Sequence, residues 1–252
     1  MSVEPPILSV ITVVYNDKKN IERTLLSVLQ QSYPHIEYII VDGASTDGTL
    51  EIINSHKEKI SNLISEPDKG IYDAMNKAMK LATGKYLIFM NSGDVFYESE
   101  TVEKVFATAT DADIYYGETE MINDQLQSLG RRRHKVPEVF TLKSFKYGMS
   151  ISHQAIYVKR ILAEPYDSKY KLSADIDWIL KIVKKSNHIV NTHLYVAKYL
   201  VGGMSKKRHL QSLKERYEIF KNYYGLIPNL FNHLIIAFRL GFYWILNRRT
   251  ND

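Results

Sequence analysis

The sequence contains no cysteine in its 252 residues. This excludes disulfide scaffolds, zinc fingers, iron–sulfur sites and thiol nucleophiles, so any metal site must use oxygen or imidazole ligands. Neither sign of charge is in large excess. The 33 Lys and Arg residues and the 28 Asp and Glu residues give a net charge of +5. That excess indicates a mild preference for anionic partners such as phosphates or lipid headgroups. It gives no reason to expect nucleic acid as a partner.

Long uninterrupted hydrophobic runs are missing as well. The first residues lack the basic segment, apolar stretch and cleavage site of a signal peptide, which predicts a cytoplasmic protein. Residues 226–246 are strongly apolar, but Asn229, Asn232, His233 and Arg239 interrupt them. Because a membrane span needs ~20 predominantly apolar residues, we do not predict one here.

The composition is otherwise that of an ordinary folded protein, with 45% hydrophobic and 24% charged residues. The β-branched run at 8–15 predicts a strand, and the apolar spacing within 16–31 predicts a helix. The same alternation recurs at 36–57 and 61–81, and 86–90 predicts a further strand followed by a turn. Strands alternating with helices predict an α/β fold with a mostly parallel, Rossmann-like central sheet flanked by helices. Beyond residue 94 the alternation loosens, with strands predicted near 113–116, 154–158 and 188–196 and a long charged helix at 205–224.

Ligands of an open parallel sheet bind beyond the carboxyl ends of its strands. Those positions hold Asn16, Asp42, Asp68 and the run Asn91-Ser-Gly-Asp94. The glycine-rich turn of dinucleotide-binding folds and the GxxxxGK[ST] phosphate loop are both absent. Carboxylates repel a diphosphate, so a divalent cation would have to bridge the two. We select Asp94 as the metal ligand, with an ordinary tight turn as the alternative for Ser-Gly-Asp.

Five blocks carry a resemblance to a known family: SVITVVYN (9–16), VDGASTDGT (41–49), EPDKGIYDAMNK (66–77), GKYLIFMNSGD (84–94) and ADIDW (174–178). In this order the chain resembles, over about 7–205, family 2 glycosyltransferases with the GT-A fold that build bacterial polysaccharides and lipid-linked glycans. The resemblance implies a domain at 1–204, with a nucleotide-sugar half at about 1–98 and an acceptor half at about 99–204. A helical extension follows at 205–252.

The resemblance also implies the nucleotide-sugar site. A UDP-sugar donor would lie against Tyr15, Asn16, Asp42, Asp68, Lys69 and Asn91, with Asp42 accepting a hydrogen bond from the base. A carboxylate can accept from an imide N–H, and such charge-assisted bonds are strong. The alternative for 42–48 is a loop and a helix capped by Thr46 or Asp47. Lys69 is equally well explained as a solvated turn lysine.

The metal and acceptor positions follow from the same resemblance. Mg²⁺ or Mn²⁺ would bind at Asp94, although the family usually carries two aspartates here and this chain carries one. His153 and Gln154 would contact the acceptor, with a structural histidine as the alternative. The run 131–135 is basic and either touches an acceptor phosphate or forms a solvated loop. The glycines at 202–203 suit either a flap or an ordinary loop.

Asp175 matches the family's general base, with Ala174 where the family has glutamate. At a helix N-terminus the dipole favours its ionised form, and the alternative is a helix cap. The reaction implied is hexosyl transfer with inversion to a hydroxyl of a glycan or lipid-diphosphate-linked acceptor. The Gln-x-x-Arg-Trp signature of processive synthases is absent, which predicts one sugar per encounter. Two rivals stay open: a nucleotidyltransferase, and a nucleotide-sugar-binding protein without turnover.

The end of the chain predicts an amphipathic helix with a broad apolar face. Such a face has to be covered. Basic residues around it would suit peripheral contact with the inner face of the cell membrane. A homodimer seam or a brace on the catalytic domain explains the face equally well, and the sequence leaves these alternatives open.

Overall fold

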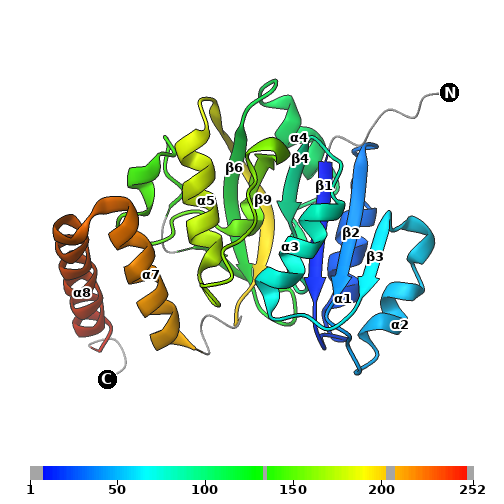
Figure 1. The fold of residues 1–252 in the computed structure, drawn as a ribbon, viewed down its shortest axis with the longest axis horizontal. Helices are drawn as coiled ribbons and strands as arrows, with labels where there is room; N and C mark the ends of the chain where they lie inside the picture. Colours follow the sequence, from blue (N-terminus) through cyan, green and yellow to red (C-terminus); the bar gives the residue numbers. More distant parts are fainter. Residues whose placement is uncertain (1–7, 133–134, 203–207, 249–252) are drawn as a thin grey trace.

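The computed structural model describes residues 8–132, 135–202 and 208–248, which form a sheet covered by helices on both faces (Figure 1). The described strands are β1 (Leu8–Val14), β2 (Ile36–Asp42), β3 (Asn62–Ser65), β4 (Tyr86–Phe89), β5 (Val95–Phe96), β6 (Ile114–Ile122), β7 (Ser128–Arg131), β8 (Ile156–Lys159) and β9 (Ile189–Leu200). Their order is β3-β2-β1-β4-β8-β6-β9-β5, and β7 pairs with β6 outside this path.

The sheet is parallel from β3 to β4 and mixed beyond it. β1 pairs in parallel with both β2 and β4, whereas β8 runs antiparallel to its neighbours β4 and β6. β6 and β9 form a second parallel pair, and β5 and β7 add antiparallel edges. The α/β fold predicted from the sequence is confirmed, and the loosening of the pattern after residue 94 corresponds to the mixed half.

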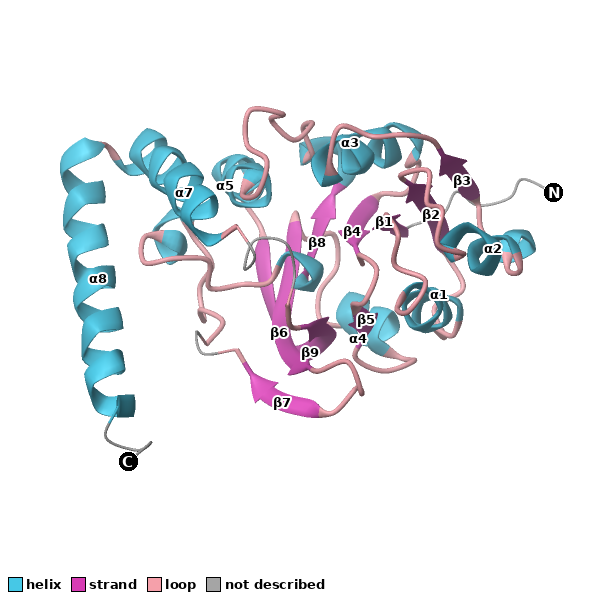
Figure 2. Ribbon diagram, turned by 90° about the horizontal axis from the view of Figure 1, so that it is seen from below, coloured by secondary structure: helices cyan, strands magenta, loops and turns pink. Residues whose placement is uncertain are grey.

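The helices lie in two layers with the sheet between them (Figure 2). They are α1 (Ile21–Leu29), α2 (Thr49–Asn54), α3 (Ile71–Leu81), α4 (Thr101–Ala107), α5 (Ala174–Lys185), α7 (His209–Tyr224) and α8 (Leu226–Arg248). One apolar core joins α3, α5 and α7 to one face of the sheet, and a second joins α1, α2 and α4 to the other. β1 contributes Ile11 and Val13 to the first core and Leu8, Val10 and Val14 to the second, which explains its continuous apolar run.

Two local predictions differ from the structure. The strand predicted from Gln154 begins only at Ile156, because 153–155 form a 3-10 turn. The alternative of a cap at Thr46 or Asp47 is wrong, since Gly48 takes the N-cap position of α2 with a left-handed φ of 97°. Asp47 still accepts the Thr49 N–H at 3.0 Å. Residues 203–207 lie outside the described part, so a flap and an ordinary loop at 202–203 both stay open.

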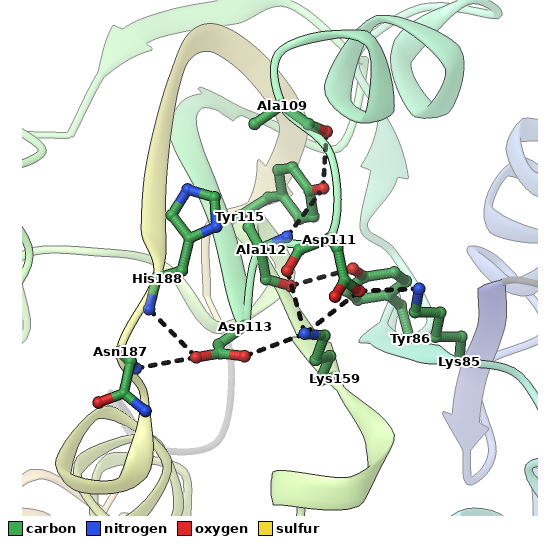
Figure 3. A network of polar contacts seen from close by, with 10 residues as sticks. All are labelled: Lys85, Tyr86, Ala109, Asp111, Ala112, Asp113, Tyr115, Lys159, Asn187 and His188. Atoms are coloured by element: carbon green, nitrogen blue, oxygen red, sulfur yellow. Dashed lines mark hydrogen bonds and ion pairs between the residues drawn. The ribbon is translucent and has the colours of Figure 1, made fainter.

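A polar network links strands at the end of the sheet opposite to the carboxyl ends of β1, β2 and β4 (Figure 3). Asp113, just before β6, accepts the backbone N–H groups of Asn187 and His188 at 2.8 and 3.1 Å and pairs with Lys159 at 3.1 Å. Burial alone would raise the pKa of Asp113, but these donors outweigh it and lower the pKa. The network therefore holds β6, β8 and the start of β9 in register.

Helix α8 stands at the end of the molecule, beyond the two layers, and packs against α7 (Figure 1). Within the described residues, no helix has the length and apolar character needed to cross a membrane. The side chains beyond Arg239 lie outside the description.

Candidate active site

Asp42 is the last residue of β2 and is fully buried. Its Oδ2 accepts the N–H of Ser45 at 3.0 Å and the hydroxyl of Ser65 at 2.7 Å. Its Oδ1 is buried and has no hydrogen-bond partner among the described residues. Because a buried polar atom is costly to leave unpaired, this oxygen is ready to accept a donor from a ligand.

Tyr15 and Asp68 close over the end of β2 because residue 43 is glycine. A Cβ atom at Gly43 would lie 2.5 Å from Asp68 Oδ2 and 3.2 Å from the ring atom Cδ2 of Tyr15. The tyrosine side chain is 65% exposed, so its ring is open to a ligand. The structure therefore brings Tyr15, Asp42 and Asp68 together, as the sequence predicted for these strand ends.

Asn16 and Lys69 have more local contacts. Asn16 has a left-handed φ of 49°, its N–H donates to Ser45 Oγ at 2.8 Å, and its Oδ1 accepts the Thr46 N–H at 2.8 Å. It thus ties the loops after β1 and β2 together. Lys69 is exposed, and its backbone N–H donates to Asp73 at 3.0 Å. Their contact with a nucleotide stays a prediction.

The turn after β4 carries Asn91 and Asp94. Thr24 of α1 holds it, accepting the Gly93 N–H at 2.9 Å and donating to the Asp94 carbonyl at 2.8 Å. The Asp94 carboxylate accepts the Gln154 amide at 3.0 Å and the Leu200 N–H at 3.1 Å. Burial raises the pKa of Asp94 to about 7, against the opposing effect of these two donors. Gln154 thus has a contact inside the site that the sequence did not indicate.

These residues fit a divalent cation whose remaining ligands come from a substrate. Within the described ranges no three His, Cys, Asp or Glu side chains could surround a metal. Mg²⁺ is commonly held by one or two carboxylates together with substrate phosphates, however, and Asp94 supplies one carboxylate. The Oδ1 atom of Asn91 is buried without a partner in the described chain, which adds a neutral oxygen nearby.

Asp175 is the second residue of α5, in its first turn. The Tyr72 hydroxyl, from the start of α3, donates to Asp175 Oδ1 at 3.0 Å. Burial, followed by the charge of Asp175, raises the pKa of Tyr72 well above its usual value, so this hydroxyl stays protonated. Asp177 is directed elsewhere, to Lys181 at 2.7 Å and Tyr223 at 3.1 Å. Asp175 is therefore the carboxylate of this turn that is not ion-paired within the described residues.

His153 packs among the rings of Phe89, Tyr166 and Trp178. Its Nε2 is 2.7 Å from the Tyr166 hydroxyl, and its ring stacks on Phe89 at 4.9 Å. Burial lowers the pKa of His153, and the charge of Asp175 opposes this. A neutral, enclosed imidazole is suited to positioning its neighbours, and its contact with an acceptor stays a prediction.

Tyr199 lies on β9, directly before Leu200, whose N–H donates to Asp94. Burial and the charges of Asp94 and Asp175 raise the pKa of Tyr199, and the charge of Arg132 opposes them. Neither the position of Tyr199 nor the hydrogen bond from Tyr72 to Asp175 was predicted from the sequence. The position of Tyr72 within the block at 66–77 was the one available signal for that hydrogen bond.

The family model described as Glycosyl transferase family 2 matches residues 9–164, which span β1 to β8 and most of these positions. The chain belongs to glycosyl transferase family 2. The PGL/p-HBAD biosynthesis glycosyltransferase of Mycobacterium tuberculosis is 30% identical over 211 residues, 79% of each chain. A glycosyltransferase role follows for this protein, and the nucleotidyltransferase alternative is set aside.

Solved structures show the same fold. The 1–349 fragment of Staphylococcus aureus TarS in complex with UDP-GlcNAc matches with a TM-score of 0.65 and 21% identity, covering 93% of this chain and 71% of that one. The mannosyltransferase PcManGT of Pyrobaculum calidifontis, in complex with GDP-Man and Mn²⁺, matches with a TM-score of 0.64 and 19% identity. This match covers 88% of the present chain and 65% of the PcManGT chain. These matches confirm the GT-A fold.

Proposed function

We propose that this family 2 member transfers one hexose from a UDP-sugar to an acceptor hydroxyl, with inversion at the anomeric carbon. The observation that carries the proposal is the convergence of three carboxylates at the carboxyl edge of the sheet. Asp42 offers an unpartnered oxygen at the end of β2, and Asp94 follows β4, two strands along the same edge. Asp175 accepts from Tyr72, whose ring lies 5.2 Å from that of Tyr166, the partner of His153.

The donor is held by the first half of the site. The uracil imide N–H donates to Asp42 Oδ1, where a charge-assisted bond offsets the cost of burying the carboxylate. Tyr15 covers the base, and Asp68 accepts from the ribose. Lys69 supplies a positive charge beside the diphosphate. The complexes of TarS with UDP-GlcNAc and of PcManGT with GDP-Man support a nucleotide-sugar at this edge.

Asp175 acts as the general base. It removes the proton of the acceptor hydroxyl while that oxygen attacks the anomeric carbon, and the bond from this carbon to the donor phosphate breaks on the opposite face. Tyr72 orients the carboxylate through its hydrogen bond and leaves the other oxygen for the substrate. A single displacement inverts the anomeric configuration and needs no covalent enzyme intermediate.

Asp94 and Asn91 would hold Mg²⁺ or Mn²⁺ together with the donor diphosphate. The cation supplies charge neutralisation for the departing UDP. Gln154 and the Leu200 N–H keep the Asp94 carboxylate in place. His153, held by Tyr166, keeps the neighbouring Gln154 in position and borders the space for the acceptor.

The acceptor is a hydroxyl of a glycan or lipid-diphosphate-linked glycan, and α8 brings the protein to the membrane that holds it. The polar stripe of α8 packs on α7, where Asn229 donates to the Tyr217 carbonyl at 3.1 Å and the His233 ring lies 5.0 Å from that of Tyr217. The opposite half of α8 is apolar and exposed, through Leu226, Ile227, Leu230, Phe231, Leu234, Ile235 and Phe238. No acidic residue occurs anywhere in α8, which suits an anionic headgroup layer on the cytoplasmic side.

The test uses UDP release from a panel of UDP-hexoses with Mn²⁺, and calorimetry for UDP binding. We expect Asp175→Asn to lower kcat by about 100-fold or more while the Kd for UDP changes less than twofold. Asp177→Asn is the matched control, because that side chain points to Lys181, and its kcat should stay within about threefold. Turnover that survives in Asp175→Asn contradicts the base assignment. UDP binding without turnover of any hexose would identify a binding protein instead.

A further inference from the structure

Two arginines from distant segments, Arg132 and Arg216, have no role in the mechanism above. Arg132, directly after β7, donates through Nη1 to Ser152 Oγ at 2.8 Å and through Nη2 to the Met149 carbonyl at 3.4 Å. Ser152 is two residues before Gln154, whose amide holds Asp94. For the run 131–135 the sequence left two alternatives, a contact with an acceptor phosphate and a solvated loop. Arg132 is half-buried and hydrogen-bonded, which does not fit a solvated loop, and residues 133–134 lie outside the description.

Arg216 approaches from α7. It shares a helix face with Ser212, four residues earlier, whose hydroxyl lies 3.2 Å from that of Ser173, the residue before α5. Ile219, three residues later, is fully buried. Arg216 is thus placed on the side of α7 that faces the start of α5, where Asp175 lies. Its Nε is buried and has no hydrogen-bond partner in the described part of the chain.

The two guanidinium groups act on each other. Burial lowers the pKa of Arg132, the charge of Arg216 lowers it further, and Tyr199 and Asp175 raise it. Among the described residues neither guanidinium lies within ion-pair distance of a carboxylate. Two like charges close together in a partly buried place repel each other, and an anion between them relieves that repulsion.

We propose that Arg132 and Arg216 together bind a phosphate group carried by the acceptor, an inference that rests on the proposed function. A guanidinium presents planar, forked N–H donors that match phosphate oxygens, and Arg132 is already oriented by Ser152 and Met149. The donor diphosphate is assigned to the turn of Asp94, whereas Arg216 comes from the face of α7 on which Ser212 contacts Ser173, two residues before Asp175. A phosphate held there places the acceptor hydroxyl next to the base, and the two positive charges offset the repulsion between phosphate and Asp175.

The test is calorimetric titration of the full chain, with and without saturating UDP and Mg²⁺. Three probes represent the sources of an acceptor phosphate: glycerol 3-phosphate as a monoester, bis(glycerol) phosphate as a diester, and geranyl diphosphate as a soluble lipid diphosphate. Glycerol is the uncharged control. We expect at least one phosphate probe to bind, and its identity indicates which kind of acceptor the site takes.

Arg132→Gln and Arg216→Gln should each weaken that binding about tenfold or more, since a charge-assisted hydrogen bond is lost. Arg216→Lys, which keeps the charge without the fork, should lie in between, and it replaces Arg216→Gln if that variant does not fold. The exposed Lys214→Gln on the same helix should change binding less than twofold. Phosphate binding that is absent, or indifferent to both arginines, overturns the proposal. Because UDP binding is measured in the same samples, failure of the donor site is seen separately.

Discussion

Asp94 occupies a functional position, and its ionised form lowers the stability of the folded protein. Its folded-state pKa of about 7 lies above the usual value of 3.8 because the carboxyl is buried. Between these two pH values the folded chain holds a proton that the unfolded chain has released. The stability of the protein should therefore fall as pH rises from about 4 to about 7.

Asp94→Asn removes this titration and should be more stable than the parent at pH 8, by an amount on the order of 2–4 kcal/mol, and similar to it below pH 4. An amide rotation of Gln154 lets the asparagine keep both hydrogen bonds. Thermal unfolding of the metal-free proteins across pH 4–8 measures the difference, with the exposed Asp124→Asn as control. A difference that does not grow with pH would refute this account. UDP release should nevertheless drop at least tenfold in the variant, because the cation loses its carboxylate.

Helix α7 holds the loop that leads into α5. Glu215 Oε2 accepts the Leu172 N–H at 2.8 Å, and its Oε1 accepts the N–H of Lys171 at 3.1 Å. These bonds lie three to four residues before Asp175, in the loop that leads into α5. Glu215 is therefore a positioning residue for the base, acting through the backbone.

Glu215→Gln should lower kcat about three- to thirtyfold with little change in the KM for the donor. One amide nitrogen would face a backbone N–H, so one of the two bonds is lost. Hydrogen exchange of residues 171–175 should accelerate in the same variant, which loss of global stability alone would not confine to this loop. Glu218→Gln, on the same helix and 3.6 Å from Lys169, is the matched control. Unchanged exchange with reduced kcat would argue against positioning.

The elements also show what the sequence could reveal. The grouping of Asp42 and Asp68 was predictable from the sequence. The alternation of short strands and helices shows where each strand ends, and adjacent parallel strands end at one edge of the sheet. Arg216 and Tyr199 were not predictable in this way, and for Arg132 the sequence offered a contact with an acceptor phosphate only as one of two alternatives. Their positions depend on the pairing of β6 with β7 and β9 and on the docking of α7, contacts between residues far apart in the chain that leave no local periodicity.

A surface helix usually turns its apolar face to the core, and α8 does the reverse. Its polar side chains are used against α7, and its apolar half is exposed, with Phe238 at 77% and Leu234 at 67%. The sequence predicted the broad apolar face but not its direction, because the periodicity of one helix does not show which side its neighbour covers. Exposed apolar patches of this kind mark interaction surfaces, and the proposed membrane contact makes a direct prediction.

Full-length protein should float with vesicles of anionic phospholipid and much less with zwitterionic ones, because burial of the apolar face is reinforced by attraction to the headgroups. The double variant Phe231→Glu and Leu234→Glu should weaken vesicle binding at least about tenfold, since two exposed side chains no longer enter the interface and two negative charges meet an anionic surface. Ile161→Glu, on an apolar residue 89% exposed elsewhere, should bind like the parent. A parent protein that does not float but sediments as a dimer, and becomes a monomer in the double variant, would assign this face to a second copy of the chain instead.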